Sequence, residues 1–405
     1  MSAHPLDPAA PDASIGLTAL ARMAFEGVDQ QPLFARLIER AEGGDAVALM
    51  DLATMLLLNS QTENGLNVQA QALAAQRIYR RPSPVAGGSP LRVLAIMTAG
   101  DMMANTPLDF LLAGADAELI SLYVDASGAL PDPLPGHDIA FLAIGESEAN
   151  QPVLRALAPR LAAWPKPLLN ADALKIASLT RDGACALLEG AEGLVAPAAA
   201  RLDRSQMQAL ADGALAPADV LPGAAWPLIA RPIGSHAGTG LLKLDAATAV
   251  AAYLAEQPAE RFYLSPFIDY SGPDSLFRKH RIVVIEGRPF VCHMAVSPRW
   301  MVHYLNADML ENARNREEEA RFFAEFDAFA ARHAAAFQAL HQRLGLDYFG
   351  IDSGETADGR LLVFEVDVAM IVHDMDPPDL FPYKKPQMRK VFDAFQAMLK
   401  RRAAV

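Results

Sequence analysis

Five carboxylates, at positions 352, 355, 358, 365 and 367, lie in an otherwise apolar stretch, "YFGIDSGETADGRLLVFEVDVAM" (residues 348–370). The Asp-Gly dipeptide at 358–359 is typical of the tight turn that joins two strands of a β-hairpin. If these two residues form the centre of the turn, Asp352 faces Glu365 across the strands. Alternation along the second strand then puts Asp367 on the same face. Like charges placed this close are destabilising, so we expect something positive among them.

Oxygen ligands without His or Cys favour Mg²⁺ or Mn²⁺. Mg²⁺ in particular takes one or two carboxylates and completes its shell with phosphate oxygens and water. We therefore predict Asp352, Glu365 and Asp367 as metal ligands. The alternative is an ordinary hairpin whose polar face meets water.

A second segment, "PLIARPIGSHAGTGLLKLD" (227–245), places Gly234, Gly238 and Gly240 between two apolar strands. Glycines in such a turn let backbone N–H groups approach a phosphate without a Cβ in the way. The segment lacks the G-K-[ST] ending of a Walker loop. It predicts a lid over a triphosphate, and the alternative is a mobile loop.

A third segment is "RFYLSPFIDYSGPDSLFRKHRIVVI" (261–285). The strand that ends in "SPFID" can offer backbone groups to a purine edge, and Asp269 can accept hydrogen bonds from ribose hydroxyls. Arg281 returns on the next strand, where it can meet an anion. The alternative is a pair of ordinary strands with a surface arginine.

The elements that must carry these residues follow from periodicity. Helical spacing predicts three helices before residue 81, and it resembles a tetratricopeptide-type pair over 44–79. "RRPSPVAGGSP" (80–90) is the clearest linker. The predicted helices cover 17–41 in two consecutive stretches, 45–58 and 67–80.

After the linker, short apolar strands alternate with helices, which indicates a parallel α/β sheet of Rossmann-like type. The rest of the chain reads as α+β, with one strand over 280–297, a long helix over 311–344 and a final helix over 388–402. The predicted fold class is α/β with an α+β C-terminal part. The predicted domains are 1–85, 86–170 and 171–405.

Composition limits the function classes. A net charge of −13 argues against nucleic acid as a partner, since phosphate backbones are bound by clustered Lys and Arg. No apolar run reaches the length of a membrane span. The two cysteines have no metal-ligand spacing, and the start of the chain lacks the pattern of a secretory signal. We expect a cytoplasmic protein.

The order of these motifs resembles the ATP-grasp enzymes, particularly the glutathione synthetase-like and RimK-type carboxylate–amine ligases. The resemblance covers roughly residues 90–400. It implies a pre-ATP-grasp domain, a Gly-rich phosphate loop, an adenine-binding hinge, a "D-x-R"-like strand, and magnesium ligands. These positions are filled by "LRVLAIMTAG", "RPIGSHAGTG", "FYLSPFID", "KHRIVV", and "GIDS" with "FEVD".

Carried over by position, the resemblance assigns Arg281 and Arg231 to catalysis, and Arg231 stands where the family has a nucleotide-binding lysine. A second family lysine is replaced by Gly183, and either Lys175 or Arg181 can substitute for it. Asp367 stands where the family has asparagine. The nucleotide contacts implied are Arg231, Gly234, Ser235, His236, Gly238, Thr239, Gly240, Ser265, Pro266, Phe267 and Asp269.

The implied activity is an ATP- and Mg²⁺-dependent (or Mn²⁺-dependent) ligation of a carboxylate to an amine through an acyl phosphate. Its substrates would be small molecules or peptides, and the N-terminal helices would recognise a carrier or peptide or form a homodimer. Such chemistry needs positioning and charge neutralisation, and Arg281 would hold the acyl phosphate oxygens. Arg299, His303 and His373 are the candidate substrate contacts. The alternatives are a small-molecule kinase and a non-catalytic nucleotide-binding or scaffold protein.

Overall fold

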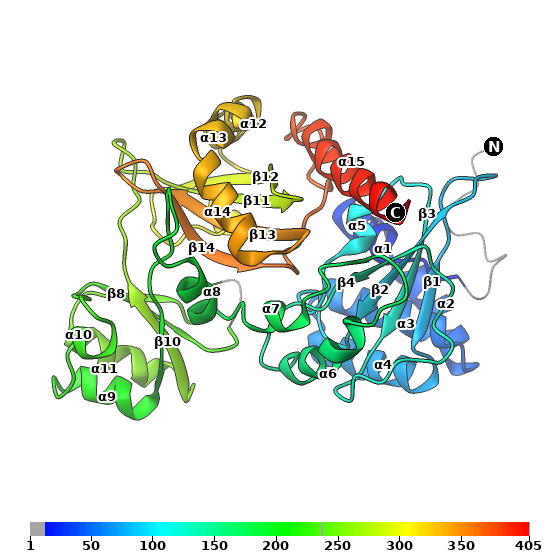
Figure 1. Ribbon diagram of the computed structural model, residues 1–405, viewed down its shortest axis with the longest axis horizontal. Coiled ribbons are helices and arrows are strands. Elements are labelled where there is room, and N and C mark those ends of the chain that lie inside the picture. Colours follow the sequence, from blue (N-terminus) through cyan, green and yellow to red (C-terminus); the bar gives the residue numbers. More distant parts are fainter. Residues whose placement is uncertain (1–12, 236–237, 405) are drawn as a thin grey trace. The chain divides into compact units, whose positions relative to one another are not determined.

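The computed structural model describes residues 13–235 and 238–404. The chain divides into two compact units and crosses between them four times. The first unit comprises Met1–Ala177, Leu346–Phe349 and Asp367–Val405, and the second comprises Ser178–Gly345 and Gly350–Val366 (Figure 1).

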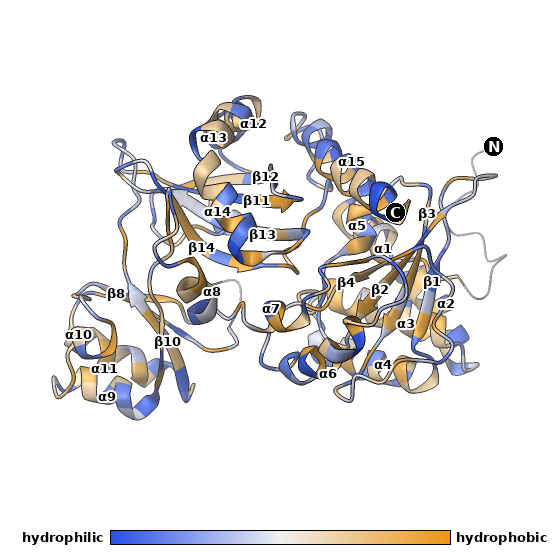
Figure 2. Ribbon diagram, in the orientation of Figure 1, coloured by the Kyte–Doolittle hydropathy of each residue, from blue (hydrophilic) through white to orange (hydrophobic). Residues whose placement is uncertain are grey.

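A five-stranded sheet in the order β1-β3-β2-β4-β5 forms the centre of the first unit. Strand β2 pairs in parallel with both β3 and β4, β4 pairs in parallel with the edge strand β5, and β1 is antiparallel to β3. Strand β4 is wholly apolar and buried, and the middle of β2 (residues 93–96) is too, as expected for strands buried on both faces (Figure 2). The strands are β1 Ile78–Arg81, β2 Leu91–Met97, β3 Ala117–Tyr123, β4 Ile139–Leu142 and β5 Leu168–Leu169.

Four helices precede the sheet, and α3 and α4 pack closely. Asp45 starts α3 by accepting hydrogen bonds from the N–H groups of Val47 and Ala48. Gly65 lets α4 approach α3, because a Cβ there would lie 2.8 Å from Leu57. The helices of this unit are α1 Leu17–Phe25, α2 Gln31–Glu42, α3 Ala46–Leu58, α4 Thr62–Ala75, α5 Leu108–Leu111, α6 Gln151–Leu161, α7 Ala173–Ala177 and α15 Lys384–Ala403.

Two expectations for the N-terminal region were wrong. The first predicted helix is two helices, with Gly27 in a left-handed conformation between them. The helix predicted over 67–80 ends at Ala75, and its last residues form β1. Tyr79 explains this change, because its ring is buried and its hydroxyl donates to the carbonyl oxygens of Ala72 and Gln76. The tetratricopeptide resemblance of α3 and α4 stays a prediction.

The second unit contains two sheets. The smaller sheet is antiparallel in the order β7-β10-β8-β9. Helices α9 and α11 share a buried core with it, which includes Met207, Val250 and Phe262. Its elements are β7 Ala200–Asp203, α9 Arg204–Ala211, α10 Pro217–Val220, β8 Leu228–Pro232, β9 Leu242–Leu244, α11 Ala247–Glu256 and β10 Arg261–Pro266.

The larger sheet has the order β12-β11-β13-β14-β6, with β6 parallel to β14. The strand predicted over 280–297 is a hairpin, because Glu286 and Gly287 both adopt positive φ and reverse the chain. The helix predicted over 311–344 is interrupted at Glu325 and His333. The elements are α8 Arg181–Leu188, β6 Leu194–Val195, β11 Phe277–Ile285, β12 Arg288–Ser297, η1 Tyr304–Asn306, α12 Ala313–Ala324, α13 Phe326–Arg332, α14 Ala334–Leu344, β13 Tyr348–Glu355 and β14 Leu361–Asp367.

The predicted fold class, α/β with an α+β C-terminal part, is confirmed by these sheets. The predicted boundary at 85/86 falls inside the first compact unit. Strand β1, which overlaps the start of the predicted linker, pairs with β3 of this unit's sheet. The boundary predicted at 170/171 lies shortly before the crossing at 177/178. No helix in the described ranges is long and apolar enough to cross a membrane.

Asn170 ties the start of β13 into the first unit. Its side chain donates to the Tyr348 carbonyl oxygen (2.8 Å) and accepts from the Tyr348 N–H (3.0 Å), and its φ is +51°. We expect Asn170→Ala to lower the free energy of unfolding by about 3 kcal/mol, because it removes buried hydrogen bonds and strains a left-handed residue. Asn170→Gly loses the same bonds without the strain, so it should be about 1 kcal/mol more stable than the Ala variant. Urea denaturation measures both, and wild-type stability in the Ala variant would refute the tie.

Candidate functional site

The turn between β13 and β14 differs from the predicted one. The N–H of Gly359 donates to the Thr356 carbonyl oxygen (2.9 Å), and the N–H of Thr356 donates to the Arg360 carbonyl oxygen (3.0 Å). The loop therefore has three residues, with Gly359 at φ +80°, and the predicted register at the turn was wrong by one residue. Continued without interruption, this register would put Asp352 opposite Phe364 and not opposite Glu365.

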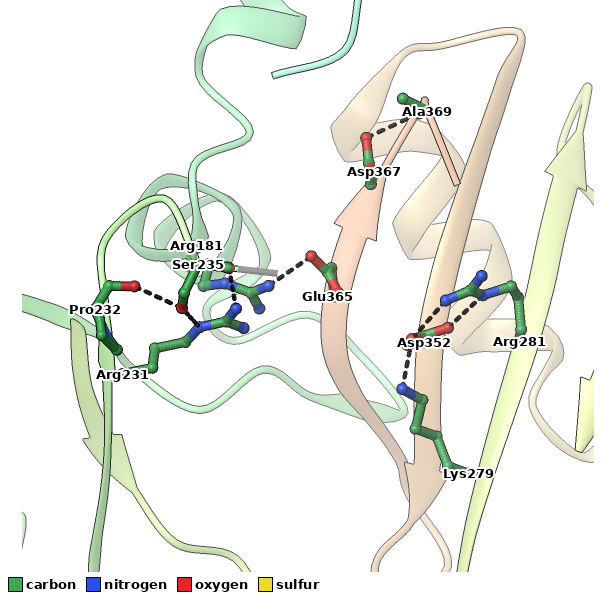
Figure 3. Close-up of polar contacts among 10 residues, drawn as sticks. All are labelled: Arg181, Arg231, Pro232, Ser235, Lys279, Arg281, Asp352, Glu365, Asp367 and Ala369. Atoms are coloured by element: carbon green, nitrogen blue, oxygen red, sulfur yellow. Dashed lines mark hydrogen bonds and ion pairs between the residues drawn. The ribbon is translucent and has the colours of Figure 1, made fainter. Parts of the chain in front are cut away.

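Asp352 on β13 is nevertheless a charged centre, with 2% of its surface exposed. Its Oδ1 accepts from Arg281 Nε (2.9 Å), and its Oδ2 accepts from Arg281 Nη2 (3.1 Å) and contacts Lys279 Nζ at 2.7 Å (Figure 3). Both cations come from one face of the neighbouring strand β11, since they are two residues apart. Burial raises the pKa of Asp352, but Arg281 and Lys279 together hold it well below its ordinary value.

A β-bulge lies directly beside Arg281. Arg281 pairs with His293 and Ile282 with Val291, so Cys292 is the extra residue on β12. Bulges re-aim neighbouring side chains and are common next to active sites. Here the bulge follows the residue that holds Asp352.

Glu365 on β14 forms the second charged contact. Its Oε1 accepts from Arg181 Nη2 at 2.6 Å (Figure 3), and its side chain keeps 33% of its surface exposed. Burial raises the pKa of Glu365 and nearby Asp352 does the same, but Arg181, Arg231 and Lys279 together outweigh both, so the pKa lies below its usual value. Arg181 is the first residue of α8, which Thr180 caps. Of the two replacements open from the sequence, Arg181 joins this cluster, whereas Lys175 belongs to the other unit.

Arg231 on β8 connects the cluster to the Gly-rich turn. It is 9% exposed, its Nε donates to Ser235 Oγ (3.2 Å), and its Nη2 donates to the Ser235 carbonyl oxygen. Burial and the charge of Arg181 lower the pKa of Arg231 to about 10, so it remains charged at neutral pH. The negative charge of Glu365 raises the pKa of Arg231 and so partly offsets this lowering.

The turn after β8 requires glycine at one position above all. A Cβ on Gly240 would lie 2.7 Å from Pro232, and its φ is +67°. The Gly240 carbonyl oxygen accepts from the Tyr253 hydroxyl at 2.9 Å, which fixes the far end of the turn. Gly234 and Gly238 also have positive φ, and Thr239 lies in the same turn. His236 lies outside the described residues.

The predicted adenine-binding hinge follows β10, which ends with Ser265 and Pro266. The N–H of Phe267 donates to the Pro227 carbonyl oxygen (3.1 Å), and Lys243 Nζ lies 4.4 Å from the centre of its ring. The predicted ribose contact, Asp269, is exposed and accepts from the Ser271 N–H at 2.9 Å.

The segment 298–312 carries two predicted substrate contacts, Arg299 and His303. Burial lowers the pKa of His303, and the charges of Lys279 and Arg281 lower it further, so His303 lies within electrostatic reach of the Asp352 pair. Arg299 is exposed. Of these two residues, His303 is the one that the charges of the described cluster reach.

Helix α12 fixes this segment. Glu319, fully buried, accepts from the Tyr304 hydroxyl (3.1 Å) and from the Met294 N–H on edge strand β12 (3.0 Å). The Tyr304 ring stacks on His293, the strand partner of Arg281, with centroids 4.7 Å apart. The segment and the bulged strand are therefore held by one buried carboxylate.

Asp367 and His373 belong to the first unit. Asp367 accepts from the Ala369 N–H at 2.8 Å, and His373 packs against the rings of Phe25 and Phe110. Within the part of the chain that the structure describes, no three His, Cys, Asp or Glu side chains are grouped as a metal site. The three-carboxylate set remains a prediction.

Sequence reasoning missed Lys279. The signal was present, because alternation along "RKHRIVV" puts Lys279 on the face of Arg281. With it, four cations, Arg181, Arg231, Lys279 and Arg281, surround two carboxylates, Asp352 and Glu365. Among the described residues of this mostly buried cluster, cations therefore outnumber carboxylates.

No protein-family model and no curated protein matches the chain. Among solved structures, the chain is similar to the VanG D-Ala:D-Ser ligase of Enterococcus faecalis, at 13% identity and a TM-score of 0.46 over 77% of this chain and 100% of that one. It is also similar to the D-alanine–D-alanine ligase of Bacillus anthracis complexed with ATP, at 13% identity and a TM-score of 0.46 over 78% of this chain and 97% of that one. For a RimK domain ATP-grasp protein of Sphaerobacter thermophilus, the identity is 15% and the TM-score 0.42, over 76% of this chain and 99% of that one. These likenesses are distant in sequence.

Removing Arg281 tests the charge balance at Asp352. We expect Arg281→Met to lower the free energy of unfolding by about 3 kcal/mol, because breaking a buried ion pair leaves a carboxylate undercompensated. Asp352→Asn added to Arg281→Met should restore part of that loss, and a double-mutant cycle by chemical denaturation measures the coupling. Additive effects of the two substitutions would contradict the pairing.

Proposed function

We propose that the chain is an ATP-dependent ligase of the ATP-grasp type, which joins a carboxylate to an amine and releases ADP and phosphate. One observation carries the proposal: a mostly buried cluster in which four cations face two carboxylates at the base of a Gly-rich turn. The excess positive charge fits a triphosphate, whose transfer depends on charge neutralisation more than on a protein nucleophile.

The arrangement of motifs supports the nucleotide part. Arg231 holds the first residues of the Gly-rich turn, which joins antiparallel strands β8 and β9. The hinge residue Phe267 follows the neighbouring strand β10. A purine at the hinge and phosphates at the arginines would then lie along one small sheet and its turn.

The carboxylates fit a magnesium ion by their chemistry. Asp352 and Glu365 lie on adjacent strands and supply hard oxygen donors, and one or two carboxylates are what Mg²⁺ commonly takes from a protein. When bound, the ion would neutralise charge on the phosphate oxygens. Asp352 and Glu365 would hold it.

The chain's own residues would then position the reactants. The substrate carboxylate attacks the γ-phosphorus of ATP, the bond to the β-phosphate oxygen breaks, and ADP and an acyl phosphate form. The amine next attacks the acyl carbon and phosphate leaves, giving an amide. Arg281 offers permanently charged donors to the transferred phosphoryl oxygens, and His303 reaches the same cluster.

Hydroxylamine tests the reaction class. The full chain incubated with ATP, Mg²⁺, hydroxylamine and a panel of amino acids and dipeptides should form hydroxamate and ADP in equal amounts, because hydroxylamine captures an acyl phosphate. A stable phosphoester without hydroxamate would identify a kinase. Nucleotide binding without ADP release would identify a non-catalytic protein.

Two substitutions test the site. We expect Asp352→Asn and Glu365→Gln each to reduce ADP release about 100-fold, the loss typical of removing one electrostatic contact to the transition state. Glu355→Gln is the matched control, since Glu355 is also on β13 but pairs with Arg332 and His333. If both site variants released ADP at the wild-type rate, Asp352 and Glu365 could not be residues of the proposed site.

A further inference from the structure

The oxygen atoms of Asp352 are already largely occupied by the chain itself. Oδ2 receives both Lys279 Nζ (2.7 Å) and Arg281 Nη2 (3.1 Å), and Oδ1 receives Arg281 Nε (2.9 Å). A carboxylate oxygen has about two lone-pair sites, so Oδ2 has none left for a metal. A dication that binds Asp352 through this oxygen must displace one of the two cations (Figure 3).

Lys279 is the cation that is easier to displace. Arg281 grips both carboxylate oxygens with a rigid fork, whereas Lys279 contributes one ammonium on a flexible stem. Moving the lysine breaks one contact, and moving the arginine breaks two.

The Lys279 ammonium lies near elements other than β13. Its charge lowers the pKa of Glu365 and of His303, so the ammonium lies within reach of both β14 and the segment 298–312. Its side chain keeps 17% of its surface exposed, while that of Asp352 keeps only 3%. The ammonium can therefore turn away from Asp352 without crossing a closed core.

We propose that Lys279 is an internal counterion that occupies the metal's place at Asp352 in the nucleotide-free chain. When Mg²⁺ and a nucleotide are bound, Asp352 would hold the ion through the oxygen that the ammonium leaves, and Lys279 would turn to a phosphate oxygen. This inference rests on the proposed function. It assigns to Lys279 a role in metal and phosphate binding that makes the two events interdependent.

The exchange predicts how metal affinity depends on Lys279. In the wild type a metal without nucleotide must compete with a cation for Asp352. Without that cation, Asp352 is less compensated and should attract the metal more strongly. The effect should appear in direct binding and in thermal stability, because a ligand stabilises the state that binds it.

The experiment uses Mn²⁺ alone as the probe, titrated by electron paramagnetic resonance without nucleotide. We expect Lys279→Met to bind Mn²⁺ about 10-fold more tightly than the wild type, since one positive charge leaves the site. Mn²⁺ should also raise its melting temperature more. Lys279→Arg keeps the charge and should resemble the wild type.

Arg278→Met is the matched control, because it removes a charge from the adjacent position of β11, where Arg278 pairs with Asp274 and Glu318. It should leave Mn²⁺ affinity unchanged. If Lys279→Met does not fold, Lys279→Gln replaces it, since the neutral amide still donates to Asp352.

The outcomes separate the two proposals. Equal Mn²⁺ affinity in the wild type and the neutral variants, or weaker affinity in the variants, overturns the counterion role even if the wild type forms hydroxamate. Tighter Mn²⁺ binding by the neutral variants in a chain that releases no ADP and binds no nucleotide supports the counterion role and overturns the proposed ligase.

Discussion

The pairing of Asp352 with Lys279 and Arg281 is the constraint that allows a carboxylate to be buried in the larger sheet of the second unit. A carboxylate this buried would be strongly destabilising without partners, and two cations from the adjacent strand supply them. Such a pair contributes little net stability compared with apolar residues of the same size. Under the proposed function its value would be functional, because a site already arranged around charges would need little reorganisation to bind an anion.

The surrounding elements can be understood as supports for that pair. The bulge at Cys292 lies beside Arg281, and the strand partner His293 stacks on Tyr304. Glu319 accepts hydrogen bonds from the Tyr304 hydroxyl and from the Met294 N–H. One N–H of the edge strand β12 is therefore paired with a buried carboxylate and is not left open. Helix α12, which the sequence predicted as part of one long helix over 311–344, thus contributes a buried carboxylate.

The sequence predicted the strands that carry Arg281 and Asp352 better than the register in which those strands meet. Alternation placed Arg281 and Asp352 correctly on strands, but an Asp-Gly pair suits both two- and three-residue loops, so the register could not be read from it. The end of the helix over 67–80 was missed because Tyr79 fits helical spacing, while its pairing with β3 is a long-range contact. The joining of Arg181 to Glu365 is also nonlocal, and no local pattern reports a contact between residues so far apart in the chain.

The four crossings of the chain between its compact units have a practical consequence for dissecting the protein. Neither unit is one continuous piece of sequence. A fragment that stops at residue 177 would lack Tyr348, the partner of Asn170, and Phe395 of α15, which packs on Phe141 of β4. Expressing the halves as separate genes would therefore leave each with an open core, and inserting or fusing other proteins is better done at surface turns such as 357–359.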